Sequence, residues 1–128
     1  MKLTLENTGE ANRIRSYDVG SITVNETAVT RTLLLTPDQL QDDWGPDDVG
    51  ELGNRHMDAI AAMAPELVLI GTGRWQQFPD RELMARTIQA GLGIEVMTTE
   101  AACRTYNVLA AEGRQVAAVL FMIEPDPH

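Results

Sequence analysis

The sequence contains almost no lysine. Lys2 is the only one, and the 10 lysines and arginines together face 19 aspartates and glutamates, which gives a formal net charge of −9 at pH 7. Nucleic acids and anionic membranes are bound through clustered basic residues that neutralise phosphates. The charge balance therefore argues against a nucleic-acid partner and against a surface that binds anionic lipid.

Cysteine, histidine and long apolar runs are scarce as well. The single cysteine, Cys103, excludes an internal disulfide and suits a reducing compartment. With only His56 and His128, no zinc site is expected, and no motif implies a cofactor. The longest apolar run, residues 116–123, is too short to span a bilayer, and the N-terminus lacks the apolar core of a signal peptide. We expect a cytoplasmic protein that does not insert into membranes.

The acidic excess is concentrated between Asp38 and Glu51, where no basic residue occurs. Calcium-binding loops alternate their carboxylates around a required glycine, and QDDWGPDDVGE does not follow that spacing. A solvated acidic loop that leads into a helix is therefore favoured over a metal site.

A length of 128 residues is that of one domain. We expect a single domain over residues 1–128, with its core at about 14–123. In the first half, short β-branched segments at 14–19, 21–25 and 28–35 predict an antiparallel meander or hairpin. Residues 37–53 carry two prolines and three glycines and are predicted to be mostly loop, before helical spacing begins at Met57 and ends at Pro65.

The second half alternates predicted strands and helices. Residues 67–70 and 116–123 are apolar throughout, which predicts strands covered on both faces and placed side by side, while the alternating residues 94–97 predict a strand nearer an edge. Asp80 is predicted to cap one helix, with Leu83, Met84 and Ile88 inward. Thr98 or Thr99 is predicted to cap the next one, with Ala102, Tyr106 and Leu109 inward.

These elements predict a single-domain α/β fold, a three-layer sandwich with a mainly parallel central sheet. The N-terminal meander is expected to extend or flank this sheet. By default, the last strand is expected to be parallel to its neighbours.

The candidate site lies in ELVLIGTGR, residues 66–74, where an apolar strand ends in Gly71, Thr72 and Gly73 with Arg74 directly behind. Ligands of open α/β sheets lie beyond the carboxyl ends of the parallel strands, and helix N-termini there favour anions. We therefore expect a small carboxylate or phosphate site at these residues and the helix start at Thr98 and Thr99, with Arg104 adding charge. The spacing after Gly73 matches neither a Rossmann fingerprint nor a P-loop, so a purely structural role for the glycines stays open.

A catalytic set cannot be assembled from the sequence. Cys103 lies on a predicted helix without a partner histidine at suggestive spacing, and His56 lies beside the Met57 stripe. Glu100 and Arg104 have the spacing of a surface helix pair. We therefore predict no catalytic residues.

The stretch TTEAACRTYNVLAAEGRQVAAVL, together with ELVLIGTG, resembles the signature of the domain of unknown function 498 family, also called Mth-938-like. The resemblance covers about residues 14–123 and rests most on the motif elements Gly71, Thr72, Gly73, Thr99, Ala102, Cys103, Thr105, Tyr106, Asn107, Leu109, Glu112, Gly113 and Arg114. It implies a three-layer domain with a central mixed sheet whose last strand runs antiparallel to its neighbours. That orientation would bring Arg114 to the same end of the sheet as Gly71, where Asn107 and Arg114 would join the candidate ligand site.

Two functions remain open on this basis. The resemblance includes a mitochondrial assembly factor for respiratory complex I, which favours a non-enzymatic protein-binding or assembly module, monomeric or weakly dimeric, with a protein partner. The alternative is a protein or enzyme that binds a small anionic ligand at the candidate site. Asn107, Glu112 and Arg114 would have a third role, a structural one, if they only hold the last helix to the sheet. Trp44 and Trp75 lie in predicted loops, where each could anchor the core or mark an interface.

Overall fold

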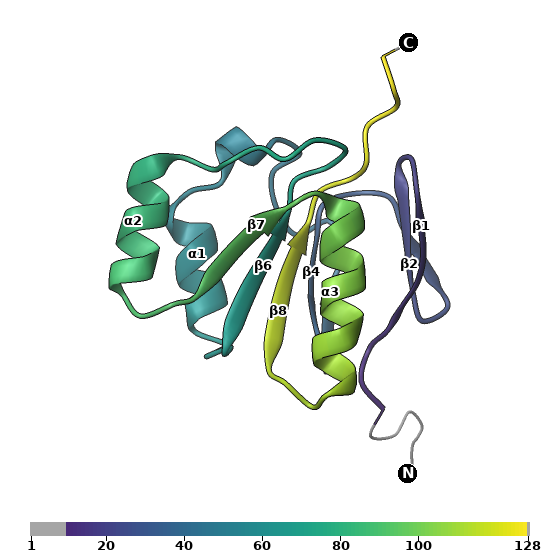
Figure 1. Ribbon diagram of the computed structural model, residues 1–128, viewed down its shortest axis with the longest axis horizontal. Coiled ribbons are helices and arrows are strands. Elements are labelled where there is room, and N and C mark those ends of the chain that lie inside the picture. The colour runs from purple at the N-terminus through teal and green to yellow at the C-terminus, as the bar shows by residue number, and fades with distance from the viewer. Residues whose placement is uncertain (1–9, 128) are drawn as a thin grey trace.

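The central layer of the computed structural model, which describes residues 10–127, is a five-stranded mixed sheet (Figure 1). Its strand order is β5-β4-β8-β6-β7. The strands are β4 Leu33–Thr36, β5 Gln39–Gln41, β6 Leu67–Gly71, β7 Ile94–Met97 and β8 Val116–Leu120. The two wholly apolar strands, β6 and β8, are neighbours and β7 forms an edge, as their hydropathy predicts.

Strand β8 is parallel to β6 and antiparallel to β4. The antiparallel orientation that the resemblance implies for the last strand is therefore right for its neighbour β4 and wrong for its neighbour β6, where the default expectation of a parallel strand is right. The helical connection from β7 to β8 explains the orientation, because a strand that returns after a crossover helix enters the sheet in the parallel direction. The mixed character of the sheet comes from β4 and β5.

Side chains of the central strands alternate between two apolar layers. On β6, Val68 and Ile70 face one layer and Leu69 faces the other, and Leu34 on β4 faces the opposite way from Leu33 and Leu35. All of these residues are buried. Both faces are covered, which is why the strands read as continuous apolar runs.

One face is covered by the 3-10 helix η1 and the helices α1 and α2 (Figure 1). Their bounds are η1 Val49–Glu51, α1 Asn54–Ala61 and α2 Arg81–Gln89. As predicted, Asp80 caps α2, where its carboxylate accepts a hydrogen bond from the Leu83 amide at 3.1 Å. The predicted inward position of Ile88 is wrong, since this side chain is 54% exposed. Thr87 is buried instead, and its hydroxyl donates to the Leu83 carbonyl at 2.7 Å.

The other face is covered by α3, Thr99–Ala111, and by a separate antiparallel sheet (Figure 1). This sheet has the order β1-β2-β3, with β1 Ile14–Asp18, β2 Ser21–Val24 and β3 Thr27–Val29. It flanks the central sheet rather than extending it. The segment at 28–35, predicted as one strand, is divided between β3 and β4 and so connects the two sheets.

Helix α3 is capped by Thr98, whose hydroxyl accepts from the Ala101 amide at 3.3 Å. Ala102 and Tyr106 are buried against the central sheet, together with Cys103, and Leu109 is partly buried. The predicted inward face of this helix is therefore correct. It places the first turn of α3 directly over the end of β6.

Candidate functional site

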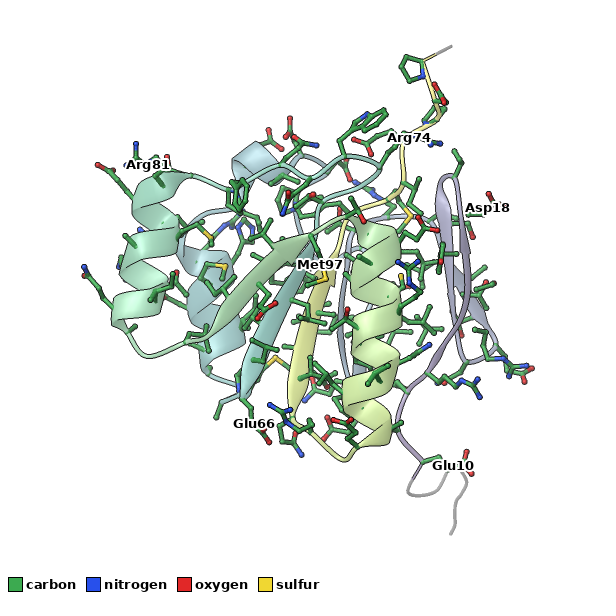
Figure 2. All side chains as sticks on the ribbon, in the orientation of Figure 1. Glu10, Asp18, Glu66, Arg74, Arg81 and Met97 are labelled. Atoms are coloured by element: carbon green, nitrogen blue, oxygen red, sulfur yellow. The ribbon has the colours of Figure 1, made fainter. Side chains whose placement is uncertain are left out.

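The carboxyl ends of β6, β7 and β8 meet at one end of the molecule, called here the rim. Gly71, Met97 and Leu120 are register partners at this end. The β6–α2 loop and the C-terminal segment also pass there, at the top of the view in Figure 1. Figure 2 labels Arg74 at the rim and Glu66 at the opposite end of β6.

Gly71 is the point at which α3 approaches β6 most closely. A Cβ atom there would lie 2.9 Å from both the Ala102 Cβ and the Thr99 Cα and 3.0 Å from the Leu120 Cδ2. Backbone as well as side chains would have to shift to make room for it. This glycine is therefore required by packing.

Thr99 joins three segments of the chain at the rim through hydrogen bonds. Its buried hydroxyl accepts from the Gly73 amide at 2.7 Å and donates to the Phe121 carbonyl at 2.6 Å. The Thr99 amide donates to the Gly73 carbonyl at 2.9 Å. One residue thus links the start of α3, the β6–α2 loop and the segment after β8.

Glu124 covers the same loop from the C-terminal side. Its carboxylate accepts from the Arg74 amide at 2.7 Å, and the Arg74 Nε donates to the Glu124 carbonyl at 2.7 Å. Gly73 has a φ of +94°, a conformation that favours glycine, and a Cβ there would collide with the Glu124 carboxylate. A carboxylate of the chain itself therefore occupies the position where an anion was expected.

Thr72 shapes the loop that follows. Its hydroxyl donates to the Trp75 carbonyl at 2.7 Å and accepts from the Gln77 amide at 3.0 Å. Its own amide donates to the Met97 carbonyl at 2.9 Å. Backbone and side-chain groups of this buried threonine therefore fix the path of the chain through residues 72–77.

Two aromatic side chains of this fixed loop lie in solvent. Trp75 is 56% exposed and Phe78 is 69% exposed. Trp44, by contrast, is partly buried with its ring centroid 5.4 Å from that of His56. Of the two tryptophans with open roles, Trp44 packs against the core and Trp75 is presented on the surface.

A cleft of about 620 Å³ adjoins the loop. Thr72 and Gln77 form part of its wall, and its charged side chains are Asp47, Asp48, Glu124 and Arg31. Arg31 is held by Asp47 at 3.2 Å and by Asp43 at 3.3 Å. The carboxylates outnumber the guanidinium, so this cleft, called here the rim cleft, has the wrong sign of charge for an anion.

The basic residues predicted to join the site lie elsewhere. The Arg104 guanidinium donates to the Tyr17 hydroxyl at 3.1 Å and lies 3.5 Å from the Glu100 carboxylate. That pair has the predicted helix spacing, and Tyr17 adds a link to β1. Arg104 is therefore directed toward β1, whereas Thr98 and Thr99 lie at the rim.

Asn107 and Arg114 make their hydrogen bonds away from the rim. The Asn107 side chain accepts from the Ile14 amide at 2.9 Å and donates to the Ile14 carbonyl at 2.8 Å, which fastens β1 to α3. Arg114 lies at the end opposite the rim, because β8 is parallel to β6. Its Nε donates to the Glu66 carboxylate at 2.8 Å, and this hydrogen bond lowers the pKa of Glu66 and raises the pKa of Arg114.

The potential nucleophile and base do not face one another. Cys103 is buried, and burial raises the pKa of its thiol to about 12. The His56 Nδ1 accepts from the Gly53 amide at 2.9 Å, and desolvation followed by the charge of Arg55 lowers the pKa of this imidazole. Cys103 lies in the layer covered by α3, whereas His56 belongs to α1 on the other face of the sheet.

The structure describes residues 10–127. Within this range, no group of three or more histidine, cysteine, aspartate or glutamate side chains is arranged to hold a metal ion. In the same range, each helix is too short or too polar to cross a membrane.

A family model described as "Protein of unknown function (DUF498/DUF598)" matches residues 14–121. The chain belongs to this family. Two solved structures of similar proteins agree with the assignment. An NMR structure from Xanthomonas campestris has a TM-score of 0.82 at 39% identity and covers 100% of this chain and 97% of its own. A Bordetella pertussis protein described as a Mth938-like domain has a TM-score of 0.78 at 26% identity, with 99% and 96% covered.

Curated relatives of this DUF498/DUF598 chain carry two different kinds of name. The "13 kDa major membrane protein" of Francisella tularensis is 32% identical over 107 residues, which is 83% of this chain and 87% of the relative. The "NADH dehydrogenase [ubiquinone] 1 alpha subcomplex assembly factor 3" of Rattus norvegicus is 27% identical over 113 residues. That match covers 87% of this chain but 60% of the rat protein. The predicted family and the three-layer α/β fold with a mixed sheet are thus confirmed.

Proposed function

We propose that this chain is a non-enzymatic protein-binding module of the assembly-factor kind, and that it binds its partner through the exposed loop of residues 75–78. The observation that carries the proposal is the contrast within the loop. Thr72 holds the backbone at Trp75 and Gln77, while the Trp75 and Phe78 side chains remain largely exposed. Rigidly presented aromatic side chains are common anchors of protein interfaces, because little conformational freedom is lost when they bind.

The comparisons support the same class of function. Relatives named as assembly factors match almost the whole of this chain, and the matched part is about 60% of their length. The shared part is the Mth938-like fold, so a property carried by this fold would be common to both.

Affinity purification from the native host tests the proposal. We expect the tagged chain, at endogenous expression, to recover one protein in near-stoichiometric amount, and the Trp75→Ala/Phe78→Ala variant to lose it. The matched control is Ile88→Ala/Val108→Ala, which removes two exposed apolar side chains elsewhere and should retain the partner. Repeated recovery of no partner by the unmodified chain would remove the support for a binding module.

A small anionic ligand is the second candidate, and the observation that favours it is the Arg74 amide, which already donates to a carboxylate, that of Glu124, at 2.7 Å. For this function, the residues expected from the sequence would bind the anion after Glu124 has moved away from Gly73 and Arg74. Phosphate and acetate titrations followed by NMR should then shift the Gly73 and Arg74 amides, more strongly in Glu124→Gln and more weakly in Arg74→Ala. Unchanged spectra in the unmodified chain and in Glu124→Gln would end this alternative.

We also propose a cytoplasmic location and a monomer or weak homodimer. The shortness of the helices in residues 10–127 supports this location, whereas the name of the Francisella relative points to a membrane. Cell fractionation separates the two. The chain should be recovered with the supernatant, and its retention in the membrane pellet after a high-salt wash would contradict a cytoplasmic location.

A further inference from the structure

We propose that the partner of this surface presents a basic segment, with an arginine or lysine side chain in the rim cleft and adjacent apolar side chains against Trp75 and Phe78. This inference rests on the proposed protein-binding function and adds the chemistry of the partner. The expected partner is a cationic, partly apolar stretch of another protein.

The charges around the cleft select a cation. The carboxylates of Asp47, Asp48 and Glu124 and the guanidinium of Arg31 line the cleft, and the Arg74 guanidinium is bonded to the Glu124 backbone carbonyl beside it. Arg31 is already shared between Asp47 and Asp43. An incoming cation would therefore meet a net negative wall, while a carboxylate or phosphate would meet repulsion.

The exposed aromatics belong to a loop that forms part of this wall. The same loop provides Thr72 and Gln77 to the cleft and carries Trp75 and Phe78. A guanidinium attracts the face of an aromatic ring, and aliphatic side chains beside it bury apolar area on the rings. Acidic side chains and exposed aromatics together match an alternating basic and apolar segment better than they match either a purely charged or a purely apolar partner.

The walls of the cleft are already in place. On the acidic side, the Thr32 hydroxyl donates to the Pro46 carbonyl at 2.7 Å, the Trp44 amide donates to the Thr32 carbonyl at 2.8 Å, and Asp48 caps η1 by accepting from the Gly50 amide at 2.9 Å. On the other side, Thr72 holds the aromatic loop. Binding would then require little ordering of this chain, which favours affinity.

The test is an NMR titration of the ¹⁵N-labelled chain with three blocked hexapeptides. One alternates arginine with leucine, the second replaces arginine with its neutral isostere citrulline, and the third replaces it with glutamate. We expect the arginine peptide to shift the amides of residues 47–49 and 72–78 together with the Trp75 indole. The citrulline peptide should bind about tenfold more weakly or worse, and the glutamate peptide should produce no shifts.

Matched variants locate the charge effect. Asp47→Asn/Asp48→Asn should weaken binding of the arginine peptide about tenfold and reduce its salt dependence. Glu82→Gln/Glu95→Gln removes the same net charge from exposed positions on α2 and β7 and should leave the affinity within about twofold. Unchanged dispersion of the amide spectra verifies that both double variants are folded.

Three outcomes would overturn the inference. They are equal binding of the arginine and citrulline peptides, shifts confined to another surface, and concentration-dependent shifts of the same residues without peptide, which would assign the surface to a second copy.

If the native partner depends on Trp75 and Phe78 but the arginine peptide does not bind, the basic segment is wrong and the protein-binding function stands. If the arginine peptide binds as expected but the unmodified chain recovers no native partner, the preference of the surface for a basic segment stands and the protein-binding function loses its support.

Discussion

The two halves of one loop differ in burial and in their contacts with the rest of the protein. Residues 71–73 are buried and are joined to α3 by Thr99 and to the C-terminal segment by the hydrogen bond from the Phe121 amide to the Gly71 carbonyl. Residues 75–78 are all exposed, although Thr72 holds the backbone at Trp75 and Gln77. The glycine-rich half thus maintains the structure, and the aromatic half is available to a partner. Changes in the first half should alter stability, and changes in the second should alter binding alone.

Replacing Thr99 with valine should have the largest effect on stability. The shape of the side chain is kept, but the Gly73 amide and the Phe121 carbonyl lose their buried hydrogen-bond partner. A buried polar group without a partner costs about 1–3 kcal/mol, so we expect a loss of about 2–4 kcal/mol in the free energy of unfolding. Urea denaturation measures it, with Thr27→Val at an exposed position as the control. Equal urea midpoints for Thr99→Val and Thr27→Val would contradict the structural role given to the contacts of residues 71–73.

Gly71→Ala should follow, with a loss of about 1–3 kcal/mol from overpacking against the first turn of α3. The control is Gly93→Ala, since a Cβ there would meet Leu67 and Glu66 at ordinary distances of 3.6 and 3.7 Å. Thermal unfolding of both variants checks the prediction. A Gly71→Ala protein as stable as the control would show that α3 does not need the close approach.

Asn107→Ala tests a connection away from the rim. It removes both hydrogen bonds to Ile14 and should cost about 1–3 kcal/mol, with faster hydrogen exchange in β1 than in β6. Partner recovery should be unaffected once the variant is folded. The exposed Val108→Ala on the same helix is the reference. Partner loss in a folded Asn107→Ala protein would place the binding surface over α3 and β1.

The smallest expected effect is that of Glu66→Gln, at the end opposite the rim. The pKa of Glu66 in the folded chain is lowered from 4.5, first by the hydrogen bond from Arg114 and then by that from the Gln115 amide. A lowered folded pKa means that the pair stabilises the protein above pH 4.5 and that this contribution is lost as the pH falls below that value. Unfolding curves at pH 7 and pH 3 should therefore show a small deficit of Glu66→Gln that is larger at pH 7 than at pH 3. A deficit of equal size at both pH values would contradict the assignment.

The regular elements could be predicted because their signals are local. The caps at Asp80 and Thr98, the buried positions Ala102 and Tyr106, and the adjacency of β6 and β8 follow from spacing and from continuous apolar runs. The prediction for Ile88 was wrong because Thr87 takes its place on the buried face of α2. The Thr87 hydroxyl can be buried there because it donates a hydrogen bond within its own helix. The division of residues 28–35 between two sheets leaves no mark in the hydrophobic pattern.

The candidate site was less predictable because its contacts join distant parts of the chain. Gly71, Thr72, Gly73 and Thr99 do meet at the rim, which follows from the rule on strand ends. Glu124 is 50 residues from Arg74 and Glu66 is 48 residues from Arg114, and no periodicity links either pair. The acidic run before Glu51 was visible, but its position beside the aromatic loop depends on tertiary packing.

The most direct test of the division between the two halves of the loop is partner recovery by Trp75→Ala/Phe78→Ala, normalised to folded protein. We expect this variant to lose the partner. Its free energy of unfolding should stay within about 0.5 kcal/mol of that of the unmodified chain, because both side chains are exposed. Full partner recovery by this variant, or a stability loss comparable with that of Thr99→Val, would contradict this division of the loop.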